Sequence, residues 1–199
     1  MPRTTDALTF ALEFARSPWD VASLAPSAPP VCRALALPVP ETGDPLVVEL
    51  GAGSGVVTQE VRRRLGGRGR HLAVELNPRF AATLAERFPD VDVLHADARQ
   101  VPDLLRDRGL QADVVISGLP WAAFPTGDAP SLHQRLAGAM TAHGAFTQLG
   151  YAATRRAGPA RAHLAHLHAL FEEVTTSRTV WRNLPPAVVH TARRPRPCG

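Results

Sequence analysis

Three alternating glycines, Gly51, Gly53 and Gly55, follow a short apolar run and are the first residues whose spacing suggests chemistry. Glycine lets a backbone turn tightly and approach a bound molecule closely, because it has no Cβ atom. The spacing is GxGxG, whereas a turn that binds a dinucleotide pyrophosphate reads GxGxxG and would need a glycine at Val56. Glu49 would repel a pyrophosphate but attract an ammonium group, directly or through water. These residues predict a site for a ligand with an ammonium group, with a purely structural turn as the alternative.

Two further acidic residues follow the next apolar runs along the chain. Glu75 lies 24 residues after Gly51 and can accept hydrogen bonds from both hydroxyl groups of a ribose. Asp97 is placed where an adenine amino group could be recognised, or else it caps the helix that follows. S-adenosylmethionine carries an ammonium group, a ribose and an adenine, and we therefore predict it as the cofactor. The predicted cofactor contacts are Glu49, Gly51, Ala52, Gly53, Ser54, Gly55, Glu75, Leu76, Asp97, Ala98 and Ser117.

These residues lie at the ends of alternating strands and helices. From Leu46 onward, short apolar runs alternate with amphipathic stretches, which is typical of a parallel sheet wrapped by helices. The strands are predicted at residues 46–50, 71–75, 91–95, 113–117 and 145–149. The helices are predicted at residues 56–65, 78–87, 102–108, 131–142 and 160–170. The sequence thus predicts an α/β fold built from five βα units.

The C-terminal part of the chain has a different pattern. Strand-like runs at residues 174–181 and 187–192 predict a terminal antiparallel hairpin, with Trp181 in its core rather than at a ligand. The Rossmann-like core is expected to span residues 46–193. Residues 194–199 are expected to form a frayed tail, because prolines cannot continue a central strand.

The residues before the core are rich in proline, alanine and serine. Short helices are predicted at residues 5–16 and 31–37, and residues 1–45 as a whole are expected to form a helical cap over the cofactor. A length of 199 residues suits one compact unit. We therefore predict a single domain over residues 1–199.

The composition is that of an ordinary globular protein, with 45% apolar and 20% charged residues. No apolar run approaches the roughly 20 residues of a membrane-spanning helix, and the N-terminal residues make a poor secretory signal, so we expect a cytoplasmic protein. The net charge of +4 suits an anionic partner, such as a lipid surface or a nucleic acid, but is modest for this length. Cys32 and Cys198 lie far apart without a CxxC pattern, so neither a disulfide nor a metal site is expected.

Five segments resemble those of bacterial phospholipid N-methyltransferases, which are similar to ribosomal RNA adenine dimethylases. The likeness runs from about Phe14 to Arg193. The segments are Val47-Val-Glu-Leu-Gly-Ala-Gly-Ser-Gly-Val-Val-Thr58, Ala73-Val-Glu-Leu-Asn-Pro78, His95-Ala-Asp-Ala98, Ser117-Gly-Leu-Pro-Trp121 and Val180-Trp-Arg-Asn-Leu-Pro-Pro-Ala187. The first two identify only the methyltransferase superfamily, whereas the fourth and fifth look like the phospholipid group.

The resemblance implies a Rossmann-like class I methyltransferase fold, with a seven-stranded, mostly parallel sheet, a C-terminal antiparallel hairpin and helices on both faces. It also implies methyl transfer to the amine of a phosphatidylethanolamine-type phospholipid, with peripheral contact to the inner membrane surface. Adenine dimethylases carry an Asn/Asp-Pro-Pro-aromatic motif where this chain reads Ser117-Gly-Leu-Pro120. That departure counts against adenine N6 methylation, because the side-chain amide or carboxylate that would accept hydrogen bonds from the target amine is missing. A nucleic-acid partner is not expected. A small soluble amine as substrate, and a non-catalytic cofactor-binding or RNA-associated protein, remain as alternatives, and no oligomeric state is assigned.

The acceptor side is predicted at the ends of the fourth and fifth strands. A backbone carbonyl of Ser117 or Gly118 could orient an amine, and no residue is assigned as the base. Trp121, Phe124 and Tyr151 are expected to lie over the reactive methyl group, where α/β folds bind their ligands. Aromatic faces there would favour a nitrogen that becomes cationic on methylation. Ordinary packing under a loop is the alternative for each aromatic residue.

Two groups of basic residues follow the fifth strand. Arg155, Arg156 and Arg161 could meet a phosphate or lipid headgroup through their guanidinium groups, with a solvated surface as the alternative. The three histidines within residues 163–168 do not share one helical face, so no metal site is predicted there.

Overall fold

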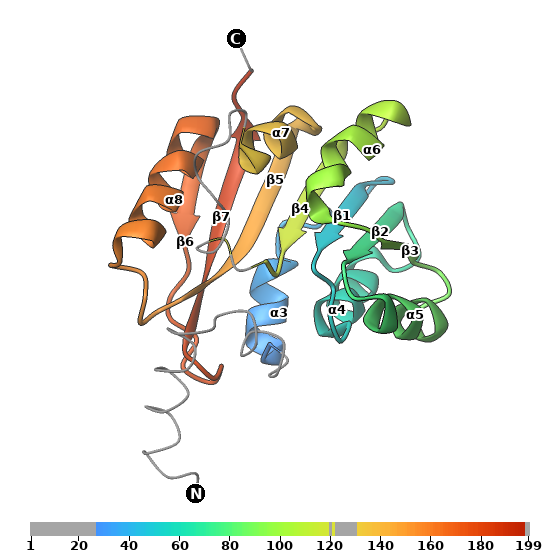
Figure 1. The fold of residues 1–199 in the computed structure, drawn as a ribbon, viewed down its shortest axis with the longest axis horizontal. Helices are drawn as coiled ribbons and strands as arrows, with labels where there is room; N and C mark the ends of the chain where they lie inside the picture. The colour runs from blue at the N-terminus through green and yellow to red at the C-terminus, as the bar shows by residue number, and fades with distance from the viewer. Residues whose placement is uncertain (1–26, 120, 122–130, 198–199) are drawn as a thin grey trace, which may run out of the picture.

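The computed structural model describes residues 27–119, 121 and 131–197. In this part of the chain, seven strands form one sheet in the order β3-β2-β1-β4-β5-β7-β6 (Figure 1). The first five run parallel, and β7 is antiparallel to both of its neighbours. The strands are β1 (Leu46–Leu50), β2 (Arg70–Glu75), β3 (Asp92–His95), β4 (Ala112–Ser117), β5 (Met140–Tyr151), β6 (Phe171–Thr176) and β7 (Ala187–Pro195).

Helices cover both faces of this sheet (Figure 1). One face carries α3 (Pro29–Leu35), α4 (Val56–Leu65) and α5 (Pro78–Arg87). The other carries α6 (Val101–Asp107), α7 (Leu132–Gly138) and α8 (Gly158–Leu170), with the short 3₁₀ helix η1 (Ala98–Gln100) leading into α6. The predicted seven-stranded α/β architecture with a C-terminal antiparallel hairpin is therefore confirmed.

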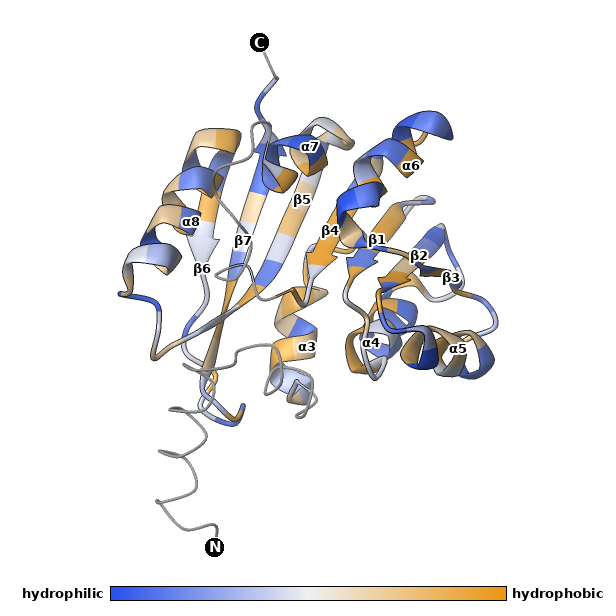
Figure 2. Ribbon diagram, in the orientation of Figure 1, coloured by the Kyte–Doolittle hydropathy of each residue, from blue (hydrophilic) through white to orange (hydrophobic). Residues whose placement is uncertain are grey.

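The sheet is buried on both faces, as a parallel sheet covered by helices must be. All five residues of β1 are buried. Their side chains alternate between two cores, because successive side chains of a strand point to opposite faces. Val48 and Leu50 pack with α6 and α7, whereas Val47 packs with α3 and α4. In Figure 2 the central strands are accordingly hydrophobic along most of their length.

The structure corrects the prediction for the C-terminal hairpin. The predicted strand 174–181 is wrong in position, since β6 spans Phe171–Thr176 and follows α8 directly. Trp181 consequently lies outside the strands with 77% of its surface exposed, so its placement in the core was also wrong. The expectation that the chain frays from residue 194 fails as well, because Pro195 pairs with Phe171 in the sheet. A proline is tolerated there because it stands at the end of its strand.

Of the other predicted boundaries, some are confirmed, some are wrong and some lie outside the described residues. Helices α4 and α5 have the predicted bounds. The predicted helix 131–142 is too long, because α7 ends at Gly138 and β5 begins at Met140, which pairs with Ala112 of β4. The predicted helix 5–16 and the side chain of Phe124 lie outside the described residues. Among the helices of the described ranges, none has the length and apolar character needed to cross a membrane.

Candidate cofactor and acceptor site

The glycine turn joins β1 to α4 at the carboxyl edge of the parallel strands. Gly51, Gly53 and Gly55 have φ angles of 72°, 52° and 80°, a left-handed region that glycine adopts without strain. The Gly51 amide donates to the Val74 carbonyl oxygen at 2.8 Å, which ties the start of the turn to β2. The turn is thus built into the sheet.

Each glycine of the turn meets a different environment. A Cβ atom on Gly55 would lie 2.6 Å from Phe88 and 2.7 Å from Leu84, so this position must be small for α5 to pack. A Cβ atom on Gly51 would lie 3.0 Å from a methyl carbon of Leu119. At Gly53 the same construction meets no atom within 4 Å. The backbone at Gly53 therefore faces open space, where a ligand can approach it closely.

Glu75 closes the other side of this space. Its side chain is only 8% exposed, and its two carboxylate oxygens hold two separate backbone segments. Oε2 accepts from the Gly53 amide and Oε1 accepts from the Asn77 amide, both at 2.8 Å. Beside it, Leu76 presents an apolar side chain that is 65% exposed. A buried carboxylate and an exposed apolar surface thus meet at the end of β2.

Glu49 is more deeply buried, with 2% exposure. Its Oε2 accepts from the Thr58 hydroxyl at 2.8 Å and lies 3.0 Å from Nε2 of His71. Sequence reasoning missed both partners. For His71 the available signal was its position directly before the apolar residues of β2, because a buried polar side chain needs a hydrogen-bond partner.

Asp97 caps the helix that follows it, as the alternative prediction had it. Its side chain accepts from the Arg99 amide at 2.8 Å and forms a capping box with Gln100. The guanidinium group of Arg99 also binds this carboxylate and holds its pKa below the usual value. Ala98, the first residue of η1, is buried.

Ser117 organises the end of β4. Its side chain is fully buried, and its hydroxyl oxygen accepts from the Leu119 amide at 3.2 Å and from the Trp121 indole at 3.0 Å. Gly118 follows, and its amide donates to the Leu50 carbonyl oxygen at 2.9 Å. A Cβ atom on Gly118 would lie 3.1 Å from the Gly51 carbonyl oxygen, so the β4 turn packs directly on the glycine turn.

Trp121 lies in a stack of aromatic side chains from two helices. Its ring centroid is 3.8 Å from that of His133 in α7 and 5.6 Å from that of His163 in α8. The two histidine centroids are 4.5 Å apart. Burial is the main cause that lowers the pKa of His133 to about 2 and that of His163 to about 4. Both imidazoles are consequently neutral at physiological pH.

Further polar residues lie beside this histidine stack, and sequence reasoning missed them. Ser117 pairs with Gln148 of β5, and Gln148 pairs in turn with His190 of β7. Gln148 is buried, and its Oε1 has no hydrogen-bond partner in the described residues. Tyr151 ends β5 next to Ala187, and burial raises the pKa of its phenol. A row of polar side chains thus crosses the sheet near the carboxyl ends of β4 and β5 and the start of β7.

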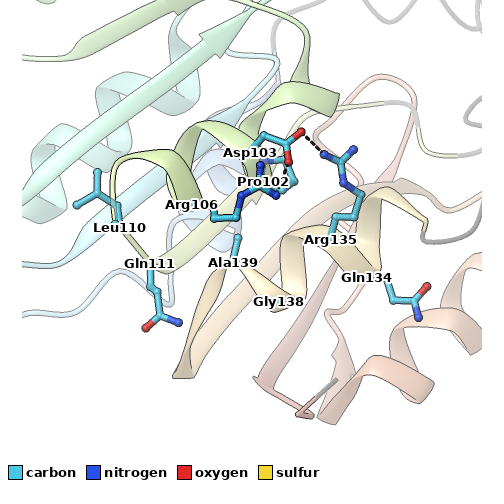
Figure 3. A pocket seen from close by; sticks show the side chains of 10 residues that line it. Pro102, Asp103, Arg106, Leu110, Gln111, Gln134, Arg135, Gly138 and Ala139 are labelled. Carbon is cyan, nitrogen blue, oxygen red and sulfur yellow. Dashed lines mark hydrogen bonds and ion pairs between the residues drawn. The ribbon is translucent and has the colours of Figure 1, made fainter. Parts of the chain in front are cut away.

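A surface pocket between α6 and α7 is separate from this site (Figure 3). Asp103 in this pocket binds Arg106 at 2.8 Å and Arg135 at 2.6 Å. Its lining includes Gln111 and Ala139, which directly precede β4 and β5. The pocket therefore lies at the amino edge of the parallel strands, opposite the glycine turn.

Nowhere in the described ranges do three His, Cys, Asp or Glu side chains lie close enough to hold a metal ion.

Comparison with known proteins agrees with this geometry. A family model described as a methyltransferase domain matches residues 47–144. The chain is 33% identical over 192 residues to an ornithine lipid N-methyltransferase of Singulisphaera acidiphila, a match that covers 94% of this chain and 96% of that protein.

Solved structures show the same fold. Precorrin-6y C5,15-methyltransferase of Geobacter metallireducens is 18% identical with a TM-score of 0.61, covering 83% of this chain and 88% of that one. A SAM-dependent O-methyltransferase of Thermotoga maritima is 14% identical with a TM-score of 0.60, covering 86% of this chain and 67% of that one. At these identities the likeness concerns the fold alone.

S-adenosylmethionine suits the carboxyl edge described above. The open space at Gly53 accepts a close ligand, and the exposed side chain of Leu76 beside Glu75 suits a flat apolar ring next to a ribose. The similarity to the relative covers 94% of the chain, and the methyltransferase family model matches residues 47–144. The chain belongs to the class I S-adenosylmethionine-dependent methyltransferases.

Proposed function

We propose that this enzyme transfers methyl groups to a primary amine of a membrane lipid headgroup. The observation that carries the proposal is the match, over nearly all of both chains, to a protein named as an ornithine lipid N-methyltransferase. A phosphatidylethanolamine-type lipid offers the same kind of amine and stays a candidate substrate. A methyl-transfer assay with both lipids distinguishes the two headgroups.

In this proposal the residues at the edges of β1 to β4 hold the cofactor. The Gly53 backbone lies against it, Glu75 accepts hydrogen bonds from the ribose, and Leu76 packs on the adenine. The Oε2 atom of Glu49 is already bound to Thr58 and His71, so we propose no direct hydrogen bond from this atom to the cofactor. The buried negative charge of Glu49 attracts the ammonium group of the cofactor instead. Ala52, Ser54, Asp97, Ala98 and Ser117 complete the proposed cofactor contacts.

The acceptor amine is held by backbone groups at the end of β4. The hydroxyl oxygen of Ser117 already accepts two hydrogen bonds, from Leu119 and Trp121, so its lone pairs are not free for an incoming amine. The carbonyl groups of Ser117 and Gly118 are the proposed acceptors. Tyr151, at the end of β5, provides an aromatic face for the nitrogen as it becomes cationic.

Bound S-adenosylmethionine supplies an electrophilic methyl group on a sulfonium. The protein's part is to align the amine in line with that methyl group and to exclude water, which converts a bimolecular step into a unimolecular one. The amine must be uncharged to attack, so its proton passes to water before the transfer. No side chain needs to act as the base in this scheme.

A methyl-transfer assay with tritiated S-adenosylmethionine tests the proposal. Vesicles with phosphatidylethanolamine, vesicles with an ornithine-containing lipid, total RNA and a metabolite extract are offered in parallel. We expect label in one or both lipid fractions, and the choice between them identifies the headgroup. Label confined to RNA or to soluble metabolites, with none in lipid, would refute the proposal. A Gly53→Val variant, which fills the open space at the turn, serves as the inactive control.

A further inference from the structure

The connector between β6 and β7, residues 177–186, carries two large apolar side chains on its outside. Trp181 is 77% exposed and Leu184 is 60% exposed. A tryptophan has a large apolar surface and a polar N–H, and residues of this kind are enriched at interfaces where one end is apolar and the other wet. The two exposed side chains together form an apolar surface that a binding partner could cover.

This connector is held in place by the fold. Asn183 is buried, and its Oδ1 accepts from the Ala28 amide at 2.8 Å while its Nδ2 donates to the Pro185 carbonyl oxygen at 2.7 Å. The Val180 amide donates to the Ala187 carbonyl oxygen at 2.7 Å. Because Asn183 anchors the middle of the connector, the neighbouring Trp181 and Leu184 are presented outward on a fixed backbone.

Four exposed arginines lie in the connector itself and in a turn that contacts it. Arg178 and Arg182 are exposed within the connector. The turn after β5 contacts the connector through a 2.9 Å hydrogen bond from Ala152 to Pro186, and it carries exposed arginines at positions 155 and 156. As far as the described residues go, none of these four guanidinium groups has an ion pair or a side-chain hydrogen bond.

The charge of this region is not neutralised by acidic residues nearby in sequence. Residues 129–199 contain nine arginines, no lysine and only two glutamates, Glu172 and Glu173. Both glutamates bind Arg194 on the sheet. A surface with free guanidinium groups around exposed apolar side chains is complementary to an anionic bilayer, which attracts the arginines and accepts the apolar groups at its interface.

The topology places this surface at the edge that carries the cofactor turn. Since β7 is antiparallel to both β5 and β6, the end of β6 lies at the same edge as the carboxyl end of β5. The carboxyl ends of β1 and β4 also lie at that edge, because these strands are parallel to β5. In Figure 1 the connector accordingly appears at the lower end of the molecule, toward which the arrowheads of β1 and β4 point.

We infer that Trp181, Leu184 and the arginines at positions 155, 156, 178 and 182 form a docking surface for an anionic lipid bilayer. The indole and the leucine enter the interfacial region, and the guanidinium groups bind lipid phosphates. Docking here brings the carboxyl edge of the sheet to the membrane, which is where a lipid amine must arrive. The purpose of the surface rests on the proposed function, but its existence can be tested without methyl transfer.

The test is sedimentation of the full chain with vesicles of phosphatidylcholine and phosphatidylglycerol, neither of which carries a primary amine. We expect binding that weakens as salt is raised, because screening reduces the attraction of exposed charges. Trp181→Ala with Leu184→Ser should lower the partition coefficient by about tenfold or more. Arg155→Gln with Arg156→Gln should lower it by about fivefold for each charge removed.

Two control variants match these changes elsewhere on the surface. Leu37→Ser alters an exposed leucine next to the C-terminal end of α4, and Arg108→Gln alters an exposed arginine at the amino edge of the sheet. Both should bind vesicles like the wild type. Equal binding by the Trp181/Leu184 variant and the wild type would overturn the inference, as would salt-sensitive binding to RNA with none to vesicles.

The docking surface and the proposed function can fail separately. If the Trp181/Leu184 variant loses activity on vesicles but keeps it on the same lipid in detergent micelles, the docking surface is supported. If the protein binds anionic vesicles through these residues yet labels no lipid, only the proposed function falls. If it labels lipid in vesicles equally well with and without Trp181 and Leu184, only the docking surface falls.

Discussion

The two buried carboxylates near the glycine turn hold different parts of the protein. Glu49 binds side chains of α4 and β2 inside the core. Glu75 binds the backbone amides of Gly53 and Asn77, so it fixes the segments that face the ligand space. Substitution of Glu75 should therefore affect ligand binding more directly than substitution of Glu49.

Glu75→Ala should weaken binding of S-adenosylmethionine by at least about tenfold, a loss of about 1.4 kcal/mol. The variant loses the proposed ribose contact and also releases the Gly53 amide from its acceptor. Titration calorimetry with the cofactor measures the effect. Glu86→Ala, an exposed glutamate of α5, is the matched control and should bind normally. An unchanged affinity in Glu75→Ala would remove the assignment of this residue.

Gly55→Ala and Gly53→Ala should differ in which property they damage. The new methyl group on Gly55 would clash with Phe88 and Leu84, so we expect a loss of about 1–3 kcal/mol in the free energy of unfolding. On Gly53 it would enter open space, so the stability loss should stay near the roughly 1 kcal/mol strain of a left-handed alanine, while cofactor affinity falls. Urea denaturation and calorimetry separate the two effects. The opposite pattern would show that the ligand does not approach Gly53.

At the scale of elements, the turn after β4 is supported by α7 and α8. Trp121 is held at one end by Ser117, and its ring packs against His133 and His163, which also contact each other. The two helices thus help to fix the position of this turn, where the acceptor amine is proposed to bind. Because His133 is buried, His163 is half-buried and both imidazoles are neutral, this support depends on pH.

Acidification should destabilise the protein between pH 7 and pH 5. Burial, with added charge repulsion from His190 and His166, lowers the pKa of His163 to about 4, whereas an unfolded histidine titrates near about 6.5. Below that value the unfolded chain binds protons that the folded protein does not, so stability falls as pH falls, by up to about 1.4 kcal/mol per pH unit for each such histidine.

Urea denaturation of the wild type and of His163→Phe at both pH values measures this effect. The phenylalanine keeps the aromatic packing and cannot bind a proton, so the variant should lose less stability on acidification. His143→Gln, at an exposed position of β5, should behave like the wild type. An equal pH dependence in His163→Phe and the wild type would mean that His163 does not titrate as described.

Elements with strong local patterns could be predicted from the sequence, and others could not. Strand β1 and helices α4 and α5 have the predicted bounds, because apolar periodicity and a helix-starting proline or glycine mark their ends. Strand β6 was misplaced because α8 runs into it without a turn residue to mark the boundary. As an edge strand with only Phe171 buried, it also has a weak apolar pattern.

The proposed cofactor side and the proposed acceptor side also differ in how far the sequence predicts them. The motifs proposed to hold the cofactor are contiguous and each follows one strand, so their meeting at one edge of the sheet could be predicted. The polar and aromatic cluster behind the proposed acceptor turn combines Trp121, His133, Gln148, His163 and His190, which four secondary-structure elements and one turn bring together. Only strand order and register place these residues side by side, and no local pattern encodes that order.

At the scale of the whole molecule, Asn183 links distant parts of the chain. It joins the β6–β7 connector to the residue before α3, 155 positions away in sequence. Its two hydrogen bonds are made by a buried amide, so removing that amide leaves backbone groups without partners. The link therefore contributes both to global stability and to the fixed shape of the connector.

Asn183→Ala should lower the free energy of unfolding by about 1–3 kcal/mol, the usual cost of leaving buried polar groups unsatisfied. Urea denaturation gives the value. Arg182→Ala, the exposed neighbour, is the control and should stay within about 0.5 kcal/mol of the wild type. A smaller loss in Asn183→Ala than in this control would show that the connector is held by other contacts.

The insertion of β7 between β5 and β6 has a consequence for synthesis of the protein. During translation β5 and β6 emerge before β7, so until the residues from Ala187 onward have been made β5 is open on one side and β6 has no strand partner. An unpaired strand edge is a template for pairing with other chains. A nascent chain that pauses before Ala187 therefore exposes the open edge of β5 and an unpaired β6, and chaperones that shield open β-structure on the ribosome would matter most at that stage.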